Sequence, residues 1–191
     1  MTNSAVPAYN ATVAELIAGA ALNDLGPGQP DALQRGRLAS LTPEAILAPF
    51  SIRDARQAQA CLAGLWLLYD FLDESHTISQ SLHTVDGSYW HGIMHRREPD
   101  YENAKYWFHR VPAHSIHEEL TAAASELAAS DADPRTRFLS QPRWDAFAFV
   151  DLCRAVRGSG TASEQLCRQI QKLEWEFLFA HCWRQAGGDS W

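Results

Sequence analysis

Three side chains that can hold a metal ion or transfer a proton are spaced along one short segment of the chain. His91, His95 and Glu98 are separated by steps of four and three residues. At 100° per residue, these steps place all three within about 60° of arc if the segment is helical. We therefore predict a helix that projects two imidazoles and a carboxylate from one face.

A second polar set precedes the first. His76 and Gln80 are four residues apart, and the intervening sequence VDGS at 85–88 predicts a turn. If the two helices pack antiparallel about this turn, counting from its midpoint places His76 opposite His95 and Gln80 opposite His91. The predicted result is a polar patch between two helices.

Such a patch supports three kinds of chemistry. Imidazoles at i and i+4 with a carboxylate can hold zinc, iron or nickel, with one position open to water. Facing imidazoles without a metal could act as general acid and base near neutral pH, which would make the protein an enzyme. The nearby Arg96, Arg97 and Arg110 could instead bind the carboxylate or phosphate of a small anionic ligand.

The patch also has a purely structural interpretation, in which hydrogen bonds between buried polar groups hold the helices together. The order His-Glu-x2-His of many zinc proteases is absent. The residues predicted to bind a divalent metal are His76, His91, His95 and Glu98. The residues predicted to orient these ligands or to contact a bound molecule are Gln80, Arg97, Asn103 and Arg110.

A longer motif covers the same region. Residues 90–108 read WHGIMHRREPDYENAKYWF, and residues 75–80 read SHTISQ. This pattern resembles an uncharacterised family of bacterial and fungal proteins with a W-H-x-I-x-H-R-R-E-x-D-x-x-N-x-x-Y-W-F core that follows A-H-x-I-A-Q. Ser75 and Ser79 stand where that pattern has alanine. The resemblance implies no activity, but it singles out His76, Gln80, His91, His95, Arg97, Glu98, Asn103 and Arg110.

Residues 88–111 also resemble a helical repeat. Gly92, Ala104 and Phe108 fall at the offsets of the glycine, alanine and aromatic positions of a tetratricopeptide repeat, and residues 100–111 resemble the second helix of a Sel1-like repeat. Arrays of such repeats bind protein partners through an extended surface. The alternative function is therefore a protein interaction module, in which the histidines form a structural polar network.

The composition predicts an all-α fold. Ala and Leu together number 49, against 13 for Val and Ile, and this ratio favours helix over strand. A chain of 191 residues suits one domain. We expect seven to eight helices, partly stacked as antiparallel hairpins around a central C-terminal helix, because the segment 161–186 is apolar on nearly every side.

The expected single domain, 1–191, has three parts. Residues 1–42 should contain one helix and a linker, residues 51–114 the hairpins that carry the histidines, and residues 115–187 the C-terminal helices. Helix N-caps are predicted at Thr12, Thr42, Ser115 and Thr161. His181, on the last of these helices, is interpreted as a half-buried histidine with its hydrogen bonds satisfied.

Charge and hydropathy exclude several classes of partner. The net charge of −7 has the same sign as a nucleic-acid or anionic-lipid surface and therefore argues against binding to either. No apolar run reaches the roughly 20 residues of a membrane span, and the N-terminal sequence lacks the pattern of a secretory signal. We expect a cytoplasmic protein whose four cysteines are reduced and buried, and whose partner is a small molecule or another protein.

Overall fold

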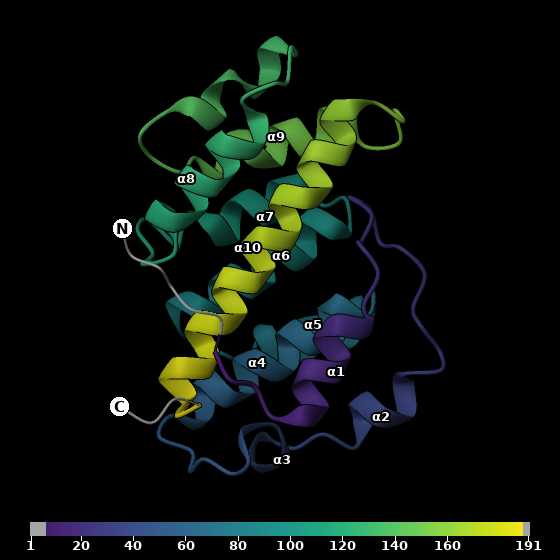
Figure 1. Ribbon diagram of the computed structural model, residues 1–191, viewed down its shortest axis with the longest axis vertical. Coiled ribbons are helices and arrows are strands. Elements are labelled where there is room, and N and C mark those ends of the chain that lie inside the picture. Colours follow the sequence, from purple (N-terminus) through teal and green to yellow (C-terminus); the bar gives the residue numbers. More distant parts are fainter. Residues whose placement is uncertain (1–6, 189–191) are drawn as a thin grey trace.

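The computed structural model describes residues 7–188, and within this range all regular structure is helical (Figure 1). The all-α prediction is confirmed. The elements are α1 (Ala11–Gly19), α2 (Arg35–Ala39), α3 (Pro43–Leu47), α4 (Ala55–Leu68), α5 (Leu72–Ser79), α6 (Val85–Arg97), α7 (Tyr101–Phe108), α8 (His117–Ala128), the 3-10 helix η1 (Pro134–Ser140), α9 (Ala146–Val156) and α10 (Ala162–Ala186). Among the described residues, eight α-helices have eight residues or more, and α2, α3 and η1 are short turns of helix between them.

The ends of the helices test the predicted caps. The hydroxyl groups of Thr42 and Thr161 accept hydrogen bonds from the first turns of α3 and α10, as predicted. The prediction for Thr12 is wrong, because Asn10 caps α1. The prediction for Ser115 is also wrong, because α8 starts at His117 and no side chain caps it. The hydroxyl of Ser115 bonds elsewhere, as described below.

The long helix α10 runs through the whole molecule and contacts both halves of the core (Figure 1). It packs against α4 in one half and against α8 and α9 in the other. The consecutive helices α4, α5, α6 and α7 each pack on the next. Most residues of α6 are buried in this arrangement. The predicted central position of the C-terminal helix is confirmed.

Two glycines permit close contacts between helices. A Cβ atom at Gly64 on α4 would lie 2.9 Å from the Trp90 ring on α6, and one at Gly92 on α6 would lie 3.0 Å from the Phe108 ring on α7. These distances are shorter than ordinary van der Waals contact. The backbones of α4, α6 and α7 can therefore approach one another only because these two positions lack side chains.

Helix α6 is the most buried helix of this group. Twelve of its thirteen residues are buried, including the polar residues Asp86, His91, His95, Arg96 and Arg97. Buried charges need partners, since an unpaired charge in the interior costs several kcal/mol. The path of α6 is therefore constrained by where its polar side chains find partners.

Arg96 has the most demanding environment of these side chains. Its guanidinium lies 2.5 Å from the Glu174 carboxylate on α10, and both side chains have no exposed surface. The guanidinium also lies 4.7 Å from the centre of the Phe149 ring on α9. Burial alone would lower the pKa of Arg96, but Glu174 outweighs it and raises the pKa above its usual value. The Arg96 guanidinium is therefore charged.

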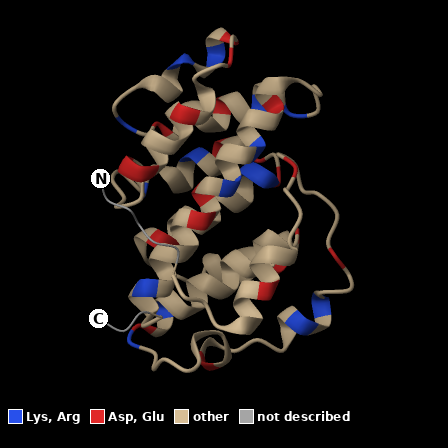
Figure 2. Cartoon of the chain, viewed as in Figure 1, with Lys and Arg blue, Asp and Glu red and all other residues tan. Residues whose placement is uncertain are grey.

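The molecule carries interspersed acidic and basic residues on its helices (Figure 2). Among the described helices, none is both long enough and apolar enough to cross a membrane. All four cysteines are free and buried, as the sequence predicts.

We predict that replacing Glu174 by alanine lowers the free energy of unfolding by about 3–5 kcal/mol, because it leaves the Arg96 charge buried without its partner. Urea denaturation measures this change. The control is Glu102→Ala, which removes a carboxylate that is 82% exposed and 3.8 Å from Arg154 and should cost about 1 kcal/mol or less. Equal losses in the two variants would contradict the prediction.

Candidate functional site

Three of the four predicted metal ligands lie together between α5 and α6. The ring of His76 on α5 is centred 4.7 Å from that of His91 and 5.4 Å from that of His95. The His91 and His95 rings, one turn apart on α6, are centred 4.7 Å from each other. One ring nitrogen of each residue lies within 4.8 Å of the other two. We call these residues the three-histidine cluster.

The loop between the two helices differs from the prediction. Helix α5 ends at Ser79, and Thr84 caps α6 by accepting a hydrogen bond from the Gly87 amide, so residues 85–88 are the first turn of α6 rather than a turn between helices. Gln80 therefore lies at the end of α5 with its side chain exposed, instead of opposite His91. His76 faces both His91 and His95.

His91 is the most deeply buried member of the cluster. The residue is 2% exposed, and its ring stacks on the Trp107 ring of α7 with the ring centres 4.0 Å apart. Neither ring nitrogen has a hydrogen-bond partner among the described residues. Burial, with the neighbouring His95 and His76, lowers the pKa of His91 to about 3. The imidazole is therefore neutral at physiological pH and offers an unprotonated nitrogen.

His95 is held from two sides. Its Nδ1 atom lies 3.0 Å from Oε2 of Glu98, and its Nε2 atom lies 3.1 Å from Nδ2 of Asn103. Because a carboxylate only accepts hydrogen bonds, Nδ1 carries the proton and Nε2 carries the lone pair. Burial lowers the pKa of His95, although Glu98 acts in the opposite direction. Glu98 thus orients the His95 ring through Nδ1. The structure places Glu98 outside the three-histidine cluster.

The three arginines considered for anion binding contact other groups. Arg96 pairs with Glu174, as described above, and the other two also have partners. Arg97 donates hydrogen bonds to the Asp70 carboxylate, 2.5 Å away, and to the carbonyl oxygen of Gly26. Arg110 donates to the Tyr106 hydroxyl, and its guanidinium lies 4.9 Å from the centre of the Trp107 ring. Neither guanidinium is directed at the imidazoles, so the basis for anion binding at the cluster is weak.

The space around the cluster also favours an ion over a larger ligand. Four well-defined cavities of the described chain are lined by other residues, and none of them includes a member of the three-histidine cluster. A metal ion needs only the space between its ligand atoms. Because His91 and His95 are buried, a larger molecule has little access to their rings.

A second polar cluster lies at the other end of α6. Oδ1 of Asp86 lies 2.9 Å from Nε2 of His114 and 3.2 Å from Nε2 of His181 on α10, and Oδ2 accepts a hydrogen bond from the Gln57 amide on α4. Burial would raise the pKa of Asp86, but the hydrogen bonds from His114, His181 and Gln57 outweigh it and hold the pKa well below its usual value. Asp86 is therefore a carboxylate at neutral pH.

The residues of this second cluster were not singled out as a site by the sequence. His114 and His181 are 67 residues apart, and neither spacing nor a motif connects them with Asp86. Only the packing of α10 beside α6 brings them together. The interpretation of His181 as half-buried and hydrogen-bonded is confirmed, since Nδ1 bonds the Ser115 hydroxyl at 3.1 Å and the side chain is 23% exposed.

Comparison with protein-family models, with curated proteins and with solved structures found no match to this chain. The chemistry that the two clusters can perform therefore follows from their own geometry. The first cluster offers three nitrogen donors, and the second is a carboxylate surrounded by N–H donors.

We predict that Asp86→Asn lowers the free energy of unfolding by about 2 kcal/mol or more at neutral pH, because the lost hydrogen bonds are made to a charged acceptor. The pKa of Asp86 in the folded protein lies below the unfolded value of about 3.9. The contribution of the Asp86 carboxylate to the free energy of unfolding is therefore complete above the unfolded pKa and is lost as the pH falls through the folded pKa.

Urea unfolding of both proteins, at neutral pH and at about pH 3, measures the difference. The difference should shrink at the lower pH. The control is Asp151→Asn, in which the replaced carboxylate is 57% exposed beside Lys105 and should contribute about 1 kcal/mol or less at either pH. A loss for Asp86→Asn that does not depend on pH would contradict the prediction.

Proposed function

We propose that this protein binds a divalent transition-metal ion through ring nitrogens of His76, His91 and His95. The observation that supports the proposal most strongly is His91, whose two nitrogens are buried without a hydrogen-bond partner among the described residues. Such a group is costly in a protein interior unless a ligand satisfies it. Two further imidazoles lie within reach of the same point.

A metal-free hydrogen-bond network explains this geometry less well. The planes of the His91 and His95 rings are inclined by only 19°, so the rings are stacked and do not direct an N–H of one at the lone pair of the other. A network would satisfy His91, whereas the observed arrangement leaves both of its nitrogens unsatisfied. A shared metal ion would bond to a ring nitrogen of His91 and would account for the proximity of the three imidazoles.

The donor set agrees with zinc, and also with iron or nickel. Imidazole nitrogens suit these ions, and bonds of about 2.0 Å to tetrahedral zinc place two ligand nitrogens about 3.3 Å apart. The nitrogens of the cluster lie within 4.8 Å of one another, so metal binding requires them to move closer together. Because the His91 and His95 rings are inclined by only 19°, rotation of their side chains is needed to direct both lone pairs at one ion.

The surrounding residues would support such a site. Glu98 accepts the Nδ1 proton of His95, which fixes the ring orientation and leaves Nε2 for the metal. The amide of Asn103 lies 3.1 Å from Nε2 of His95 and would have to move away from it when a metal ion binds there. Three protein ligands leave a fourth position open to water, which is the arrangement of catalytic rather than structural zinc sites.

The test is the metal content of the untagged protein, followed by titration of the metal-free protein with Zn²⁺. We expect one ion per chain in the parent protein and no bound ion in His91→Ala. Glu98→Gln should weaken zinc affinity by about 10–100-fold, because it removes the carboxylate that orients His95. Zinc at about 1,000 times its dissociation constant should stabilise the parent protein by about 4 kcal/mol.

Matched controls are His83→Ala and His109→Ala, which remove exposed histidines outside the cluster and should leave metal content and affinity unchanged. Circular dichroism checks that His91→Ala is folded. A parent protein that contains no metal, and whose melting temperature is the same with zinc as with chelator, would overturn the proposal. That result would favour the structural network and, with it, the interaction module.

A further inference from the structure

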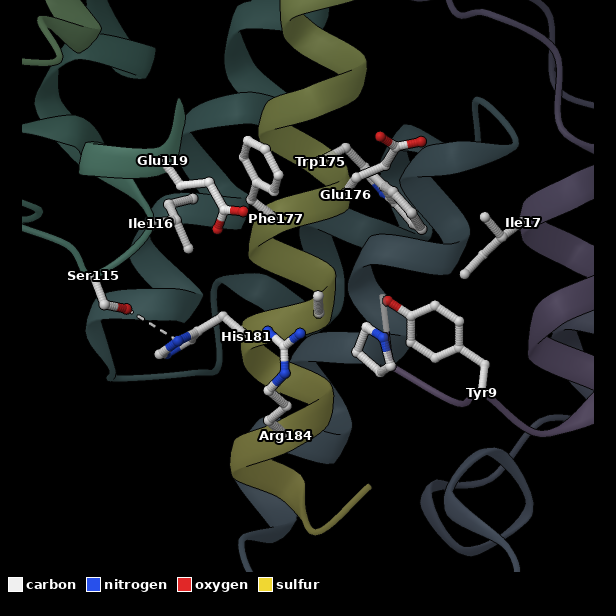
Figure 3. Close-up of a pocket in the computed structure, with 12 residues that line it drawn as sticks. Tyr9, Ile17, Ser115, Ile116, Glu119, Trp175, Glu176, Phe177, His181 and Arg184 are labelled. Carbon is white, nitrogen blue, oxygen red and sulfur yellow. Dashed lines mark hydrogen bonds between the residues drawn. The ribbon is translucent and has the colours of Figure 1, made fainter. Parts of the chain in front are cut away.

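A cavity lies between α1, α10 and the segment that leads into α8 (Figure 3). Its volume is about 350 Å³, which is at the lower end of the range for small-molecule sites. Ser115 and His181 lie on one side of it, and Tyr9 and Ile17 lie on the opposite side (Figure 3). The cavity shares no residue with the three-histidine cluster.

One hydrogen bond at this cavity joins a potential nucleophile to a base. Oγ of the exposed Ser115 lies 3.1 Å from Nδ1 of His181, and Nε2 of the same ring lies 3.2 Å from the buried Asp86 carboxylate. A hydroxyl, an imidazole and a carboxylate in this order are the parts of a serine nucleophile with its base and the group that orients the base.

The partners of the ring nitrogens define where the protons are. Nε2 of His181 faces the Asp86 carboxylate, which only accepts hydrogen bonds, so Nε2 carries the proton. Nδ1 therefore carries the lone pair and accepts a hydrogen bond from the Ser115 hydroxyl. His181 is thus already in the tautomer that a general base for Ser115 requires. The ring is reversed relative to the serine proteases, in which Nε2 faces the serine.

The same reasoning argues against a metal ion at Asp86. Nδ1 of His114 accepts a hydrogen bond from the Ile116 amide at 3.3 Å, so Nε2 of His114 is protonated and donates to Asp86. A protonated nitrogen has no lone pair for a metal. Asp86 therefore serves as the shared acceptor for two imidazoles.

The lining of the cavity suits a small substrate with an apolar part. Ile17, Ile116, Trp175 and Phe177 contribute apolar surface, and Glu119, Glu176 and Arg184 contribute charged groups. Helix α8 begins two residues after Ser115, and no side chain caps its N-terminus. The partial positive charge of a helix N-terminus favours negative charge on an oxygen beside it.

We propose that Ser115 is the nucleophile of an esterase site, with His181 as its general base and Asp86 as the residue that positions His181. The substrate is a carboxylic ester with a short apolar acyl group. This site is independent of the proposed metal centre.

The reaction has two balanced halves. Oγ of Ser115 bonds to the carbonyl carbon of the ester while its proton moves to Nδ1 of His181, and the leaving alcohol then takes that proton as its bond to carbon breaks. The product is an ester between the acyl group and Ser115. Water attacks this ester with His181 again accepting the proton, and the serine leaves with that proton, which releases the carboxylic acid and restores Ser115.

The test uses the full-length protein with p-nitrophenyl acetate and p-nitrophenyl butyrate, in the presence of chelator. We expect Ser115→Ala to lower kcat/KM by about 100-fold or more. Ser115 is exposed, so the variant should fold. Asp86→Asn should lower kcat and leave KM unchanged, because Asp86 acts through the base and does not touch the substrate. Controls are Ser159→Ala and His83→Ala, which alter an exposed serine and an exposed histidine away from the cavity and should retain full activity.

A covalent probe gives a second readout. Phenylmethylsulfonyl fluoride should attach one phenylmethylsulfonyl group to Ser115 with loss of fluoride, and peptide mass spectrometry should locate it there. Ser115→Ala should not be labelled. Three outcomes would each overturn the proposal. They are hydrolysis that persists in Ser115→Ala, hydrolysis by the parent protein that chelator abolishes, and labelling at other serines.

Discussion

The buried ion pair between Arg96 and Glu174 constrains the rest of the structure. It fixes α6 against α10 at a point with no access to water, and neither charge can leave without exposing the other to an apolar interior. Phe149 on α9 packs against the same guanidinium, so one side chain connects three helices. Buried ion pairs often add little net stability compared with apolar side chains of similar volume, so we interpret this pair as fixing the orientation of α6.

That orientation matters because α6 contributes to both polar clusters. Asp86 and His91 are five residues apart, which turns them by about 140° around the helix, so they project to nearly opposite sides. His91 and His95 meet His76 on α5, and Asp86 meets His114 and His181. The close contacts at Gly64 and Gly92 allow α4 and α7 to cover the helix on its remaining sides. A single buried helix thus positions two separate candidate sites.

Much of the first cluster could be predicted from local spacing. His91 and His95 share a helix face whatever the surroundings, and the sequence places His76 on the preceding helix. The predicted register of Gln80 was wrong because residues 85–88 belong to the first turn of α6, so the chain reverses before residue 85 and His76 faces both His91 and His95. The role of Glu98 also depended on packing, because its bond to Nδ1 of His95 becomes evident only when Asn103 and the neighbouring rings are in place.

The sequence by itself determined the helical class, the central C-terminal helix and the face that carries His91 and His95, because these depend on composition and on the helical period. Tertiary structure alone decided which polar groups are buried, paired or left without a partner. It left His91 without a hydrogen bond among the described residues, directed Arg97 to Asp70, and joined Ser115, His181 and Asp86 across long sequence separations. The physical reason is that burial and hydrogen bonding are properties of the packed interior, and a sequence pattern of a few residues does not contain them.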